Sequence, residues 1–453
     1  MIDKNYEKDS CYRRCRFVEI SNWRAYPFLQ KYIAERHLTT IEPVLPAVTT
    51  SVQSTYLTGK WPAENGIVGN GWYDRVDSEI KFWKQSNKLV IGDKIWDKAK
   101  HEDPSFTSAN MFWWYNMYST ADYAVTPRPQ YLADGRKAPD CYSQPAELRD
   151  TLQEKLGQFP LFQFWGPGAN IKSTQWIADA SMINDDLHNP TLTTIYLPHL
   201  DYCLQKFGPD FTKIQKELQE IDTVLKQLIE FYQAKNAEII ILSEYGIAPV
   251  NNPVHLNRLF RENGLLQIRI ENGLELLDAG ASKAFVVADH QIAHIYINDS
   301  SVTEQVTALL KNVKGVELVL DRAAQKKHHI DHERAGDIVV VADEKSWFTY
   351  YFWLNDAVAP DYARCVDIHK KPGYDPVEMF MTSKARAAYK LARKLAGFRY
   401  VMDVIPLDAT LVKGSHGRAN VADEYKAILI TDEVETNVQP TDVFDIIWKS
   451  LQK

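Results

Sequence analysis

The order of apolar and polar positions along the chain predicts strands and helices in alternation. Apolar runs at 16–20 and 191–201 predict strands, and the segment 26–37 predicts a helix. Apolar residues then recur at steps of three and four between 209 and 235, so one face of a long helix is buried. The run 237–246 follows at once and is apolar enough for a strand covered on both faces. This succession predicts a largely parallel sheet flanked by helices.

The elements become shorter beyond about residue 283. A strand, a helix and a strand are predicted between 283 and 321, and the segments 336–343 and 347–353 add two further strands. We therefore divide the chain into the first part of an α/β core at 1–260, a smaller inserted α+β cap at 261–400 and a return to the core at 401–453. A chain of 453 residues can bury cores of this size.

Composition narrows the classes of partner. Apolar residues make up 45%, charged residues 25%, and the net charge is −7, so no nucleic-acid partner is expected. No apolar run approaches the ~20 residues that span a bilayer, and the first residues lack a signal-like apolar stretch. We expect no membrane partner and a cytoplasmic location. Cys11 and Cys15 have no second ligand pair nearby, which argues against a zinc knuckle.

Three side chains with metal-binding or acid–base chemistry follow the predicted strands. Asp201 and Glu244 each come at the end of a β-rich run, where functional groups gather in open α/β sheets. His416 lies between small residues in "KGSHGRAN". Two carboxylates and one imidazole would suit a metal ion. Each residue alone also fits an ordinary surface turn or ion pair.

The segment from Pro46 to Gly59, "PAVTTSVQSTYLTG", carries many hydroxyl groups and no charge. Thr49, Thr50 and Ser51 stand at the predicted start of a helix, where hydroxyl side chains commonly cap free amide groups. The same place also suits a nucleophile, because a helix N-terminus attracts an anionic phosphate. The residues alone leave both interpretations open.

Five segments in order resemble the type I phosphodiesterase/nucleotide pyrophosphatase family of the alkaline phosphatase superfamily. "PAVTT", "YLTG" and "PAENGIVGN" are similar to its P-x-x-T, L-x-T-G and P-x-x-H-G-I-x-x-N segments. "YLPHLDYCLQKFGPD" resembles E-P-D-x-x-G-H-x-x-G-P, and "ILSEYGI" resembles S-D-H-G-M. "HERAGDIVVVAD" and "SHGRAN" resemble the last two segments. The resemblance covers most of 40–420 and implies an alkaline-phosphatase-like core with a cap.

The resemblance also implies roles for individual residues. Thr49 matches the threonine that attacks phosphorus, and Asn70 matches an asparagine that donates to a phosphoryl oxygen. The dipeptide Asn70–Gly71 also fits a two-residue hairpin turn. Trp72 and Tyr73 follow directly, and we expect them, with part of 112–118, to line a ligand pocket, although core packing is equally compatible. The implied substrate is a phosphorylated small molecule, such as a nucleotide.

The family normally holds two zinc ions with three Asp, three His and the nucleophile, and this chain matches only part of that set. Asp201 and His416 stand at an Asp and a His position, whereas Gln205 replaces a His and Glu244 replaces an Asp. Tyr245 replaces the His that follows. Candidates for the missing N-terminal Asp are Glu19, Ser21 and Asn22, and His199 is a candidate for compensation.

The substitutions bear on the identity and the number of metal ions. Oxygen-rich sites suit magnesium, manganese or calcium better than zinc. We therefore expect at most one tightly bound divalent ion, near Asp201 and His416. The predicted function is a metal-dependent hydrolase of phosphodiester or pyrophosphate bonds. The alternatives are a phosphonate or phosphomonoester hydrolase, or a weakly catalytic or non-catalytic protein that binds a phosphorylated ligand or a protein partner.

Overall fold

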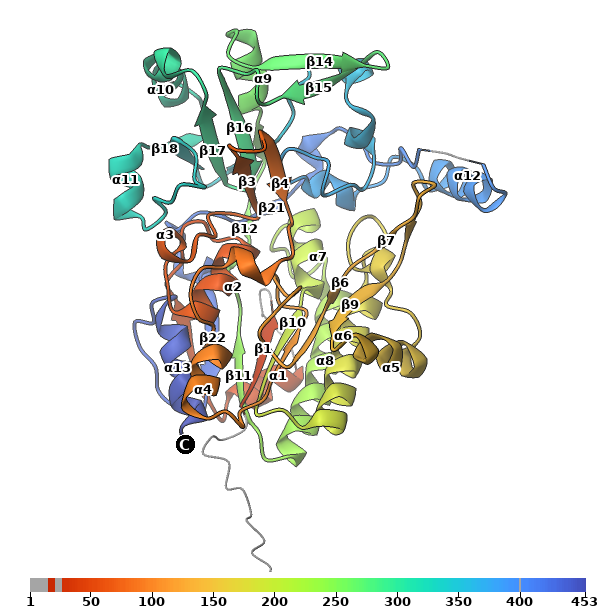
Figure 1. The fold of residues 1–453 in the computed structure, drawn as a ribbon, viewed down its shortest axis with the longest axis vertical. Coiled ribbons are helices and arrows are strands. Elements are labelled where there is room, and N and C mark those ends of the chain that lie inside the picture. The colour runs from red at the N-terminus through yellow and green to blue at the C-terminus, as the bar shows by residue number, and fades with distance from the viewer. Residues whose placement is uncertain (1–14, 21–26, 399–400) are drawn as a thin grey trace, which may run out of the picture.

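The computed structural model describes residues 15–20, 27–398 and 401–453, with the backbone alone for 15–20. An eight-stranded sheet forms the lower part of the molecule in Figure 1, in the order β2-β22-β11-β1-β10-β5-β6-β9. Neighbouring strands from β11 to β6 run parallel, and the outer strands pair antiparallel. The strands are β1 (Cys15–Ile20), β2 (His37–Ile41), β5 (Ser108–Met111), β6 (Tyr123–Pro127), β9 (Cys141–Gln144), β10 (Leu192–Leu197), β11 (Glu238–Leu242) and β22 (Ala427–Thr431).

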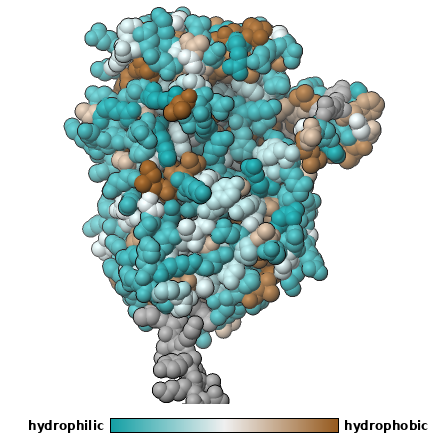
Figure 2. All heavy atoms as spheres, viewed as in Figure 1, coloured by the Kyte–Doolittle hydropathy of each residue, from teal (hydrophilic) through white to brown (hydrophobic). Residues whose placement is uncertain are grey.

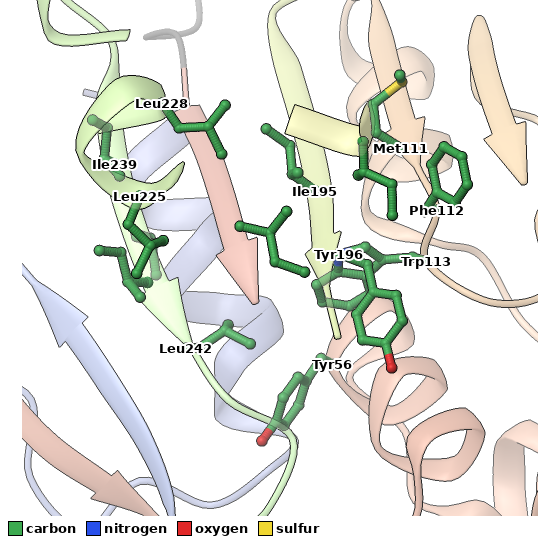
Figure 3. Close-up of a cluster of buried hydrophobic side chains, with 14 of the residues drawn as sticks. Tyr56, Met111, Phe112, Trp113, Ile195, Tyr196, Leu225, Leu228, Ile239 and Leu242 are labelled. Carbon is green, nitrogen blue, oxygen red and sulfur yellow. The ribbon is translucent and has the colours of Figure 1, made fainter. Parts of the chain in front are cut away.

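Helices cover both faces of this sheet. α6 (Ile171–His188) contacts β10, α8 (Gln215–Ala234) contacts β11, and α13 (Asp442–Leu451) contacts β1 and α2 (Thr49–Thr58). Leu225 and Leu228 of α8 are buried, as are all five residues of β11, so the sequence patterns of both elements reflect burial. Figure 3 shows these leucines in one cluster with aromatic and aliphatic side chains of the central strands.

A second, smaller sheet lies above the first one in Figure 1. Its antiparallel order is β16 (Ala284–Asp289), β17 (Ile292–Ile297), β19 (Ile338–Ala342) and β18 (Val316–Leu320). The sheet encloses a second hydrophobic core, which also takes up residues from 45–115 and 404–412. The boundaries at 260 and 400 remain a prediction.

The remaining elements complete the two layers. The helices are α1 (Pro27–Ile33), α3 (Pro62–Asn65), α4 (Ile95–Glu102), α5 (Ala146–Leu156), α7 (His199–Phe207), α9 (Leu256–Glu262), α10 (Thr303–Lys311), α11 (Arg322–Lys327) and α12 (Lys384–Leu395). The short strands are β3 (Gly71–Asp74), β4 (Glu79–Phe82), β7 (Gln130–Tyr131), β8 (Lys137–Ala138), β12 (Ala248–Pro249), β13 (Asn252–Val254), β14 (Gln267–Glu271), β15 (Leu274–Asp278), β20 (Ser346–Phe348) and β21 (Gly414–Ser415).

Two predicted strands are shorter than expected. The segment 347–353 forms strand only as far as Phe348, within β20. The run 191–201 ends as a strand at Leu197, because Pro198 precedes α7 and the chain turns helical there. Within the described part of the chain, no helix has both the length and the apolar character that crossing a bilayer requires.

Candidate functional site

Thr49 is the first residue of α2, and its side chain is 7% exposed. The capping position belongs to Val48, which makes no side-chain cap, so the Thr49 hydroxyl is not used as a helix cap. The other threonine hydroxyls of the segment bond to the backbone: Thr50 donates to the Gly69 carbonyl at 2.8 Å, and Thr55 donates to the Ser51 carbonyl at 2.9 Å. Thr49 therefore differs from Thr50 and Thr55, whose hydroxyl groups donate to backbone carbonyls.

Asn70 is held beside the start of α2. Its side-chain oxygen accepts the Thr50 amide at 3.2 Å, and its backbone and side-chain N–H groups donate to Asp289 at 2.8 and 3.1 Å. Burial raises the pKa of Asp289 to about 6, and the Asn70 donors oppose that rise. The expected hairpin turn at Asn70–Gly71 is wrong, because β3 starts at Gly71 and its turn lies at 75–78.

Tyr245 connects Thr49 with Asp201. Its hydroxyl lies 3.1 Å from Thr49 Oγ1 and donates to Asp201 Oδ1 at 3.2 Å. Gln205 Nε2 donates to the other Asp201 oxygen at 2.7 Å, and Gln205 Oε1 accepts the Tyr374 hydroxyl at 2.9 Å. Burial raises the pKa of Asp201 to about 7, and the donors from Gln205 and Tyr245 oppose this rise.

Four aromatic rings form one continuous stack beside this network. The ring centroids of Tyr245 and His416 lie 3.6 Å apart, those of His416 and His290 3.8 Å, and those of His290 and Tyr374 3.6 Å. His416 Nδ1 lies 2.7 Å from the Ala47 carbonyl oxygen. Burial holds the pKa of both histidines well below the usual range, so both imidazoles are neutral.

Thr49 lines a pocket of about 210 Å³ with Asp201, Tyr245 and His290. Its outer wall is aromatic and aliphatic and includes Trp83, Trp114, Phe164, Trp165, Tyr202 and Tyr374. Three polar side chains that line the pocket each contact another part of the protein. Gln85 donates to the Pro127 carbonyl at 2.5 Å, Lys137 pairs with Asp367 at 3.0 Å, and His369 Nδ1 lies 3.2 Å from the Phe82 carbonyl oxygen.

Glu244 follows β11 as predicted but does not line this pocket. It is buried at 5% exposure and lines a separate small crevice with Tyr245 and His416. Asp201, Gln205, His416 and Thr49 do come together, since Tyr245 bridges Thr49 to Asp201 and His416 Nε2 lies 3.9 Å from Asp201 Oδ1.

Trp72 and Tyr73 do not reach the Thr49 pocket, contrary to the sequence-based expectation. They lie in β3 and are buried in the second core. Tyr73 packs edge-on against Phe285 and Tyr296, with centroids 4.8 and 5.4 Å apart. The Arg334 guanidinium covers the Trp72 ring at 4.9 Å. Core packing is the role that their contacts support, and Trp114 is the residue of 112–118 that lines the pocket.

His199 does not stand in for a missing ligand. The expectation depended on extended backbone, whereas residues 199–207 are helical, and positions two apart on a helix point in nearly opposite directions. The His199 ring faces Glu220, with Nε2 3.4 Å from a carboxylate oxygen. Asp201 and Gln205, four apart, share one face of α7 for the same geometric reason.

The residues that the structure describes do not fit a two-metal centre. Within the described ranges, no group of three or more His, Cys, Asp and Glu side chains could hold a metal ion. Both Asp201 oxygens and both ends of the Gln205 amide are occupied by hydrogen bonds within the protein. The candidates Glu19, Ser21 and Asn22, together with the side chains of Cys11 and Cys15, lie outside the described side chains.

Sequence reasoning missed His290 and Tyr374. His290 belongs to an apparent strand pattern, but it lies in the turn between β16 and β17 with a φ of 61°, which brings its ring to the site. Tyr374 follows Gly373, where an added Cβ would lie 2.9 Å from the Ala288 carbonyl oxygen. A glycine at a close backbone approach was the one local signal for this segment.

The sequence is similar to those of known pyrophosphatases and phosphodiesterases. The chain is 27% identical to an uncharacterised pyrophosphatase/phosphodiesterase of Schizosaccharomyces pombe over 242 residues, covering 50% of this chain and 42% of the relative. It is 21% identical over 352 residues to ectonucleotide pyrophosphatase/phosphodiesterase 2 of Saccharomyces cerevisiae, covering 68% and 62%. The chain thus spans less than two thirds of the length of these relatives.

Solved structures confirm the predicted alkaline-phosphatase-like α/β fold. Phosphonoacetate hydrolase from Sinorhizobium meliloti, in complex with phosphonoformate, matches with a TM-score of 0.60 and 15% identity over 97% of this chain and 95% of that one. An inactive variant of murine ectonucleotide pyrophosphatase/phosphodiesterase 5, in complex with AMP, matches with a TM-score of 0.58 and 14% identity over 97% and 94%. Residues 15–375 match the type I phosphodiesterase/nucleotide pyrophosphatase family, so the chain belongs to it.

Proposed function

We propose that this chain hydrolyses a phosphodiester, pyrophosphate or phosphonate bond of a small phosphorylated molecule, with Thr49 as the nucleophile. One observation carries the proposal: Thr49 is the first residue of α2 and lines the largely aromatic pocket. The free amides and the positive dipole end of a helix favour an anionic phosphoryl group at this position.

The contacts of Thr49 support nucleophilic attack. Because the Tyr245 phenol donates its one proton to Asp201, the Thr49 hydroxyl is the donor in its own contact with Tyr245. The lone pairs of Thr49 Oγ1 are then available to phosphorus. Attack would form a Thr49 Oγ1–P bond and break the bond between phosphorus and the leaving group. The Thr49 proton would pass to the Tyr245 oxygen while the Tyr245 proton passes to Asp201, which returns a proton to the leaving group. In a second step water would break the Oγ1–P bond, its oxygen joining phosphorus and one of its protons restoring the Thr49 hydroxyl.

The pocket wall supports a substrate with a flat or bulky apolar organic group. Aromatic faces such as those of Trp83 and Trp165 stack on rings, and burial of apolar area contributes affinity. The hydroxyl and ring edges of a nucleoside need hydrogen-bond partners when buried. Since most of this wall is aromatic or aliphatic, it favours an aromatic or aliphatic ester over a nucleotide.

Hydrolases of this family depend on divalent metals in general, whereas the described residues do not fit two ions. The expectation of at most one tightly bound ion near Asp201 and His416 therefore remains our proposal, and no step above passes through a metal.

Release of p-nitrophenolate tests the function. Wild type and Thr49→Ala are compared on bis(p-nitrophenyl) phosphate, p-nitrophenyl phosphate and p-nitrophenyl phenylphosphonate, with and without added divalent metals. Thr55→Ala is the matched control, because its hydroxyl bonds within α2 and does not line the pocket. We expect Thr49→Ala to lose about 10³-fold or more in kcat, and Thr55→Ala to retain activity. Full activity of Thr49→Ala would refute the nucleophile.

Binding of a phosphorylated ligand without turnover is the second candidate function. It is favoured by Tyr245 and Gln205, which replace two histidines of the family motif and are occupied by hydrogen bonds. Saturable calorimetric binding of AMP or phenyl phosphate by wild-type protein that turns over none of the three substrates would support it. Turnover that Thr49→Ala abolishes would reject it.

A further inference from the structure

Helix α12 exposes an apolar face to solvent. Ala388, Leu391, Ala392 and Leu395 recur at the spacing of one helix face, and all four are exposed. Leu391 is 49% and Leu395 80% exposed, and no residue of the helix is buried. Figure 1 shows α12 standing out from the body of the molecule. A surface helix ordinarily turns this face toward the core.

The basic face of α12 is the side attached to the protein. Arg386 Nη2 and Lys390 Nζ each lie 2.5 Å from an oxygen of Asp403. The Lys390 side chain is only 12% exposed. The polarity of the helix is therefore reversed: ion pairs hold it from behind, and its leucines point away from the protein.

The exposed apolar surface extends beyond the helix. Met381, Phe398 and Val401, on either side of α12, are 38%, 56% and 52% exposed, and Tyr389 within it is 55% exposed. Figure 2 shows hydrophobic residues gathered on this projecting part. Single exposed apolar residues are ordinary, but a contiguous patch indicates a surface that another phase or molecule covers.

The charge of the segment identifies the kind of partner. Residues 384–398 contain no Asp or Glu, and the basic residues are Lys384, Arg386, Lys390, Arg393 and Lys394. The partner must therefore be apolar and anionic together. Two copies of α12 packed face to face would bring like charges together, which disfavours a second copy of this chain.

In contrast to the sequence-based expectation of no membrane partner, we propose that α12 binds the surface of a membrane that contains anionic lipids. The leucine face enters the boundary between headgroups and acyl chains. The exposed Lys384 at the N-terminal end of this face and Lys394 beside it reach lipid phosphates. An interfacial helix lies in the plane of the membrane with its polar side toward the water, which is where Asp403 holds Arg386 and Lys390. The inference does not depend on the proposed catalytic function.

Sedimentation of the full chain with vesicles tests this inference. The vesicles are phosphatidylcholine alone or phosphatidylcholine mixed with phosphatidylserine. Leu391→Asp is compared with Leu187→Asp, a control with nearly the same exposure, 49% against 48%, on the surface helix α6. Wild type and Leu187→Asp should bind the mixed vesicles, and Leu391→Asp should bind at least about tenfold more weakly. The pair Lys384→Gln and Lys394→Gln should weaken binding to the mixed vesicles alone.

Failure of wild type to sediment with the mixed vesicles, or equal binding by Leu391→Asp, would overturn the proposal. Light scattering after size exclusion tests whether a second copy of the chain covers this face instead. A dimer that Leu391→Asp abolishes would assign the face to a second copy and would also overturn the membrane proposal. Because Leu391 is exposed, the variant should unfold at the wild-type temperature, so a loss of binding would report the surface and not misfolding.

Discussion

Removing the Tyr245 hydroxyl tests the network that joins Thr49 to Asp201. Tyr245→Phe deletes one oxygen and two hydrogen bonds, of 3.1 Å to Thr49 and 3.2 Å to Asp201. A neutral bond contributes about 1 kcal/mol and one to a carboxylate about 1.5–3 kcal/mol, so we expect the free energy of unfolding to fall by about 2.5–4 kcal/mol when Asp201 is ionised.

The size of this effect should depend on pH, and its sign follows from Asp201. Burial raises the pKa of folded Asp201 to about 7. Its contribution to stability is therefore complete below the unfolded pKa near 3.9 and is lost as the pH rises through about 7. Tyr245 donates to the charged form and lowers this pKa, so Tyr245→Phe raises it further. The deficit of the variant must then grow with pH, from about 1–2 kcal/mol near pH 5 to the full value above about pH 9.

Urea unfolding of wild type, Tyr245→Phe and Tyr374→Phe at about pH 5 and about pH 9 measures the effect. Tyr374→Phe is the matched control, because its hydroxyl donates at 2.9 Å to a neutral amide oxygen of Gln205. Its cost should be about 1 kcal/mol and equal at both pH values. Equal deficits for Tyr245→Phe at both pH values would refute the bond to a buried carboxylate.

Two further predictions concern the metal and a buried ion pair. Elemental analysis of protein purified without chelator should give at most one divalent ion per chain, because imidazole ligands have been replaced by Gln205 and Tyr245. Two stoichiometric zinc ions would show that other residues rebuild the site. Lys371 is fully buried, 2.6 Å from Asp375 and 2.7 Å from Glu378, so Lys371→Met should lower the free energy of unfolding by about 3–5 kcal/mol in urea. Lys213→Met, at an ion pair whose lysine is 60% exposed, should change it by less than about 1 kcal/mol, and similar effects of the two variants would contradict the reasoning.

The parallel core could be predicted because buried strands and helices have recognisable patterns of apolar residues in the local sequence. The apolar run of β11 and the helical spacing of α8 identified a covered sheet, and its order brings the segments after β10 and β11 to either side of β1. The rule that functional groups follow such strands then located Asp201 and Glu244 near one edge. The predicted strand over 191–201 was too long, because its apolar pattern did not show that the chain becomes helical after Pro198, so Asp201 lies on α7.

The aromatic surroundings of the site could not be predicted, because they depend on contacts between distant segments. Trp72 and Tyr73 are residue types that often line pockets. Here they are part of the second core, because β3 pairs with β4 and Tyr73 packs against Phe285. His290 reaches the site because it adopts a left-handed backbone conformation in the turn between β16 and β17. Neither periodicity nor spacing encodes which aromatic residue will meet a pocket.

The stack of Tyr245, His416, His290 and Tyr374 has a consequence for the order of folding. Its four rings come from the end of β11, the loop after β21, the β16–β17 turn and the segment after Gly373. Closing such long loops costs chain entropy before the contacts are gained, so each hydrophobic core should condense first. The stack would then form among the last steps of folding. The complete site would appear only after the eight-stranded and the four-stranded sheets, each with its own core, have packed against each other.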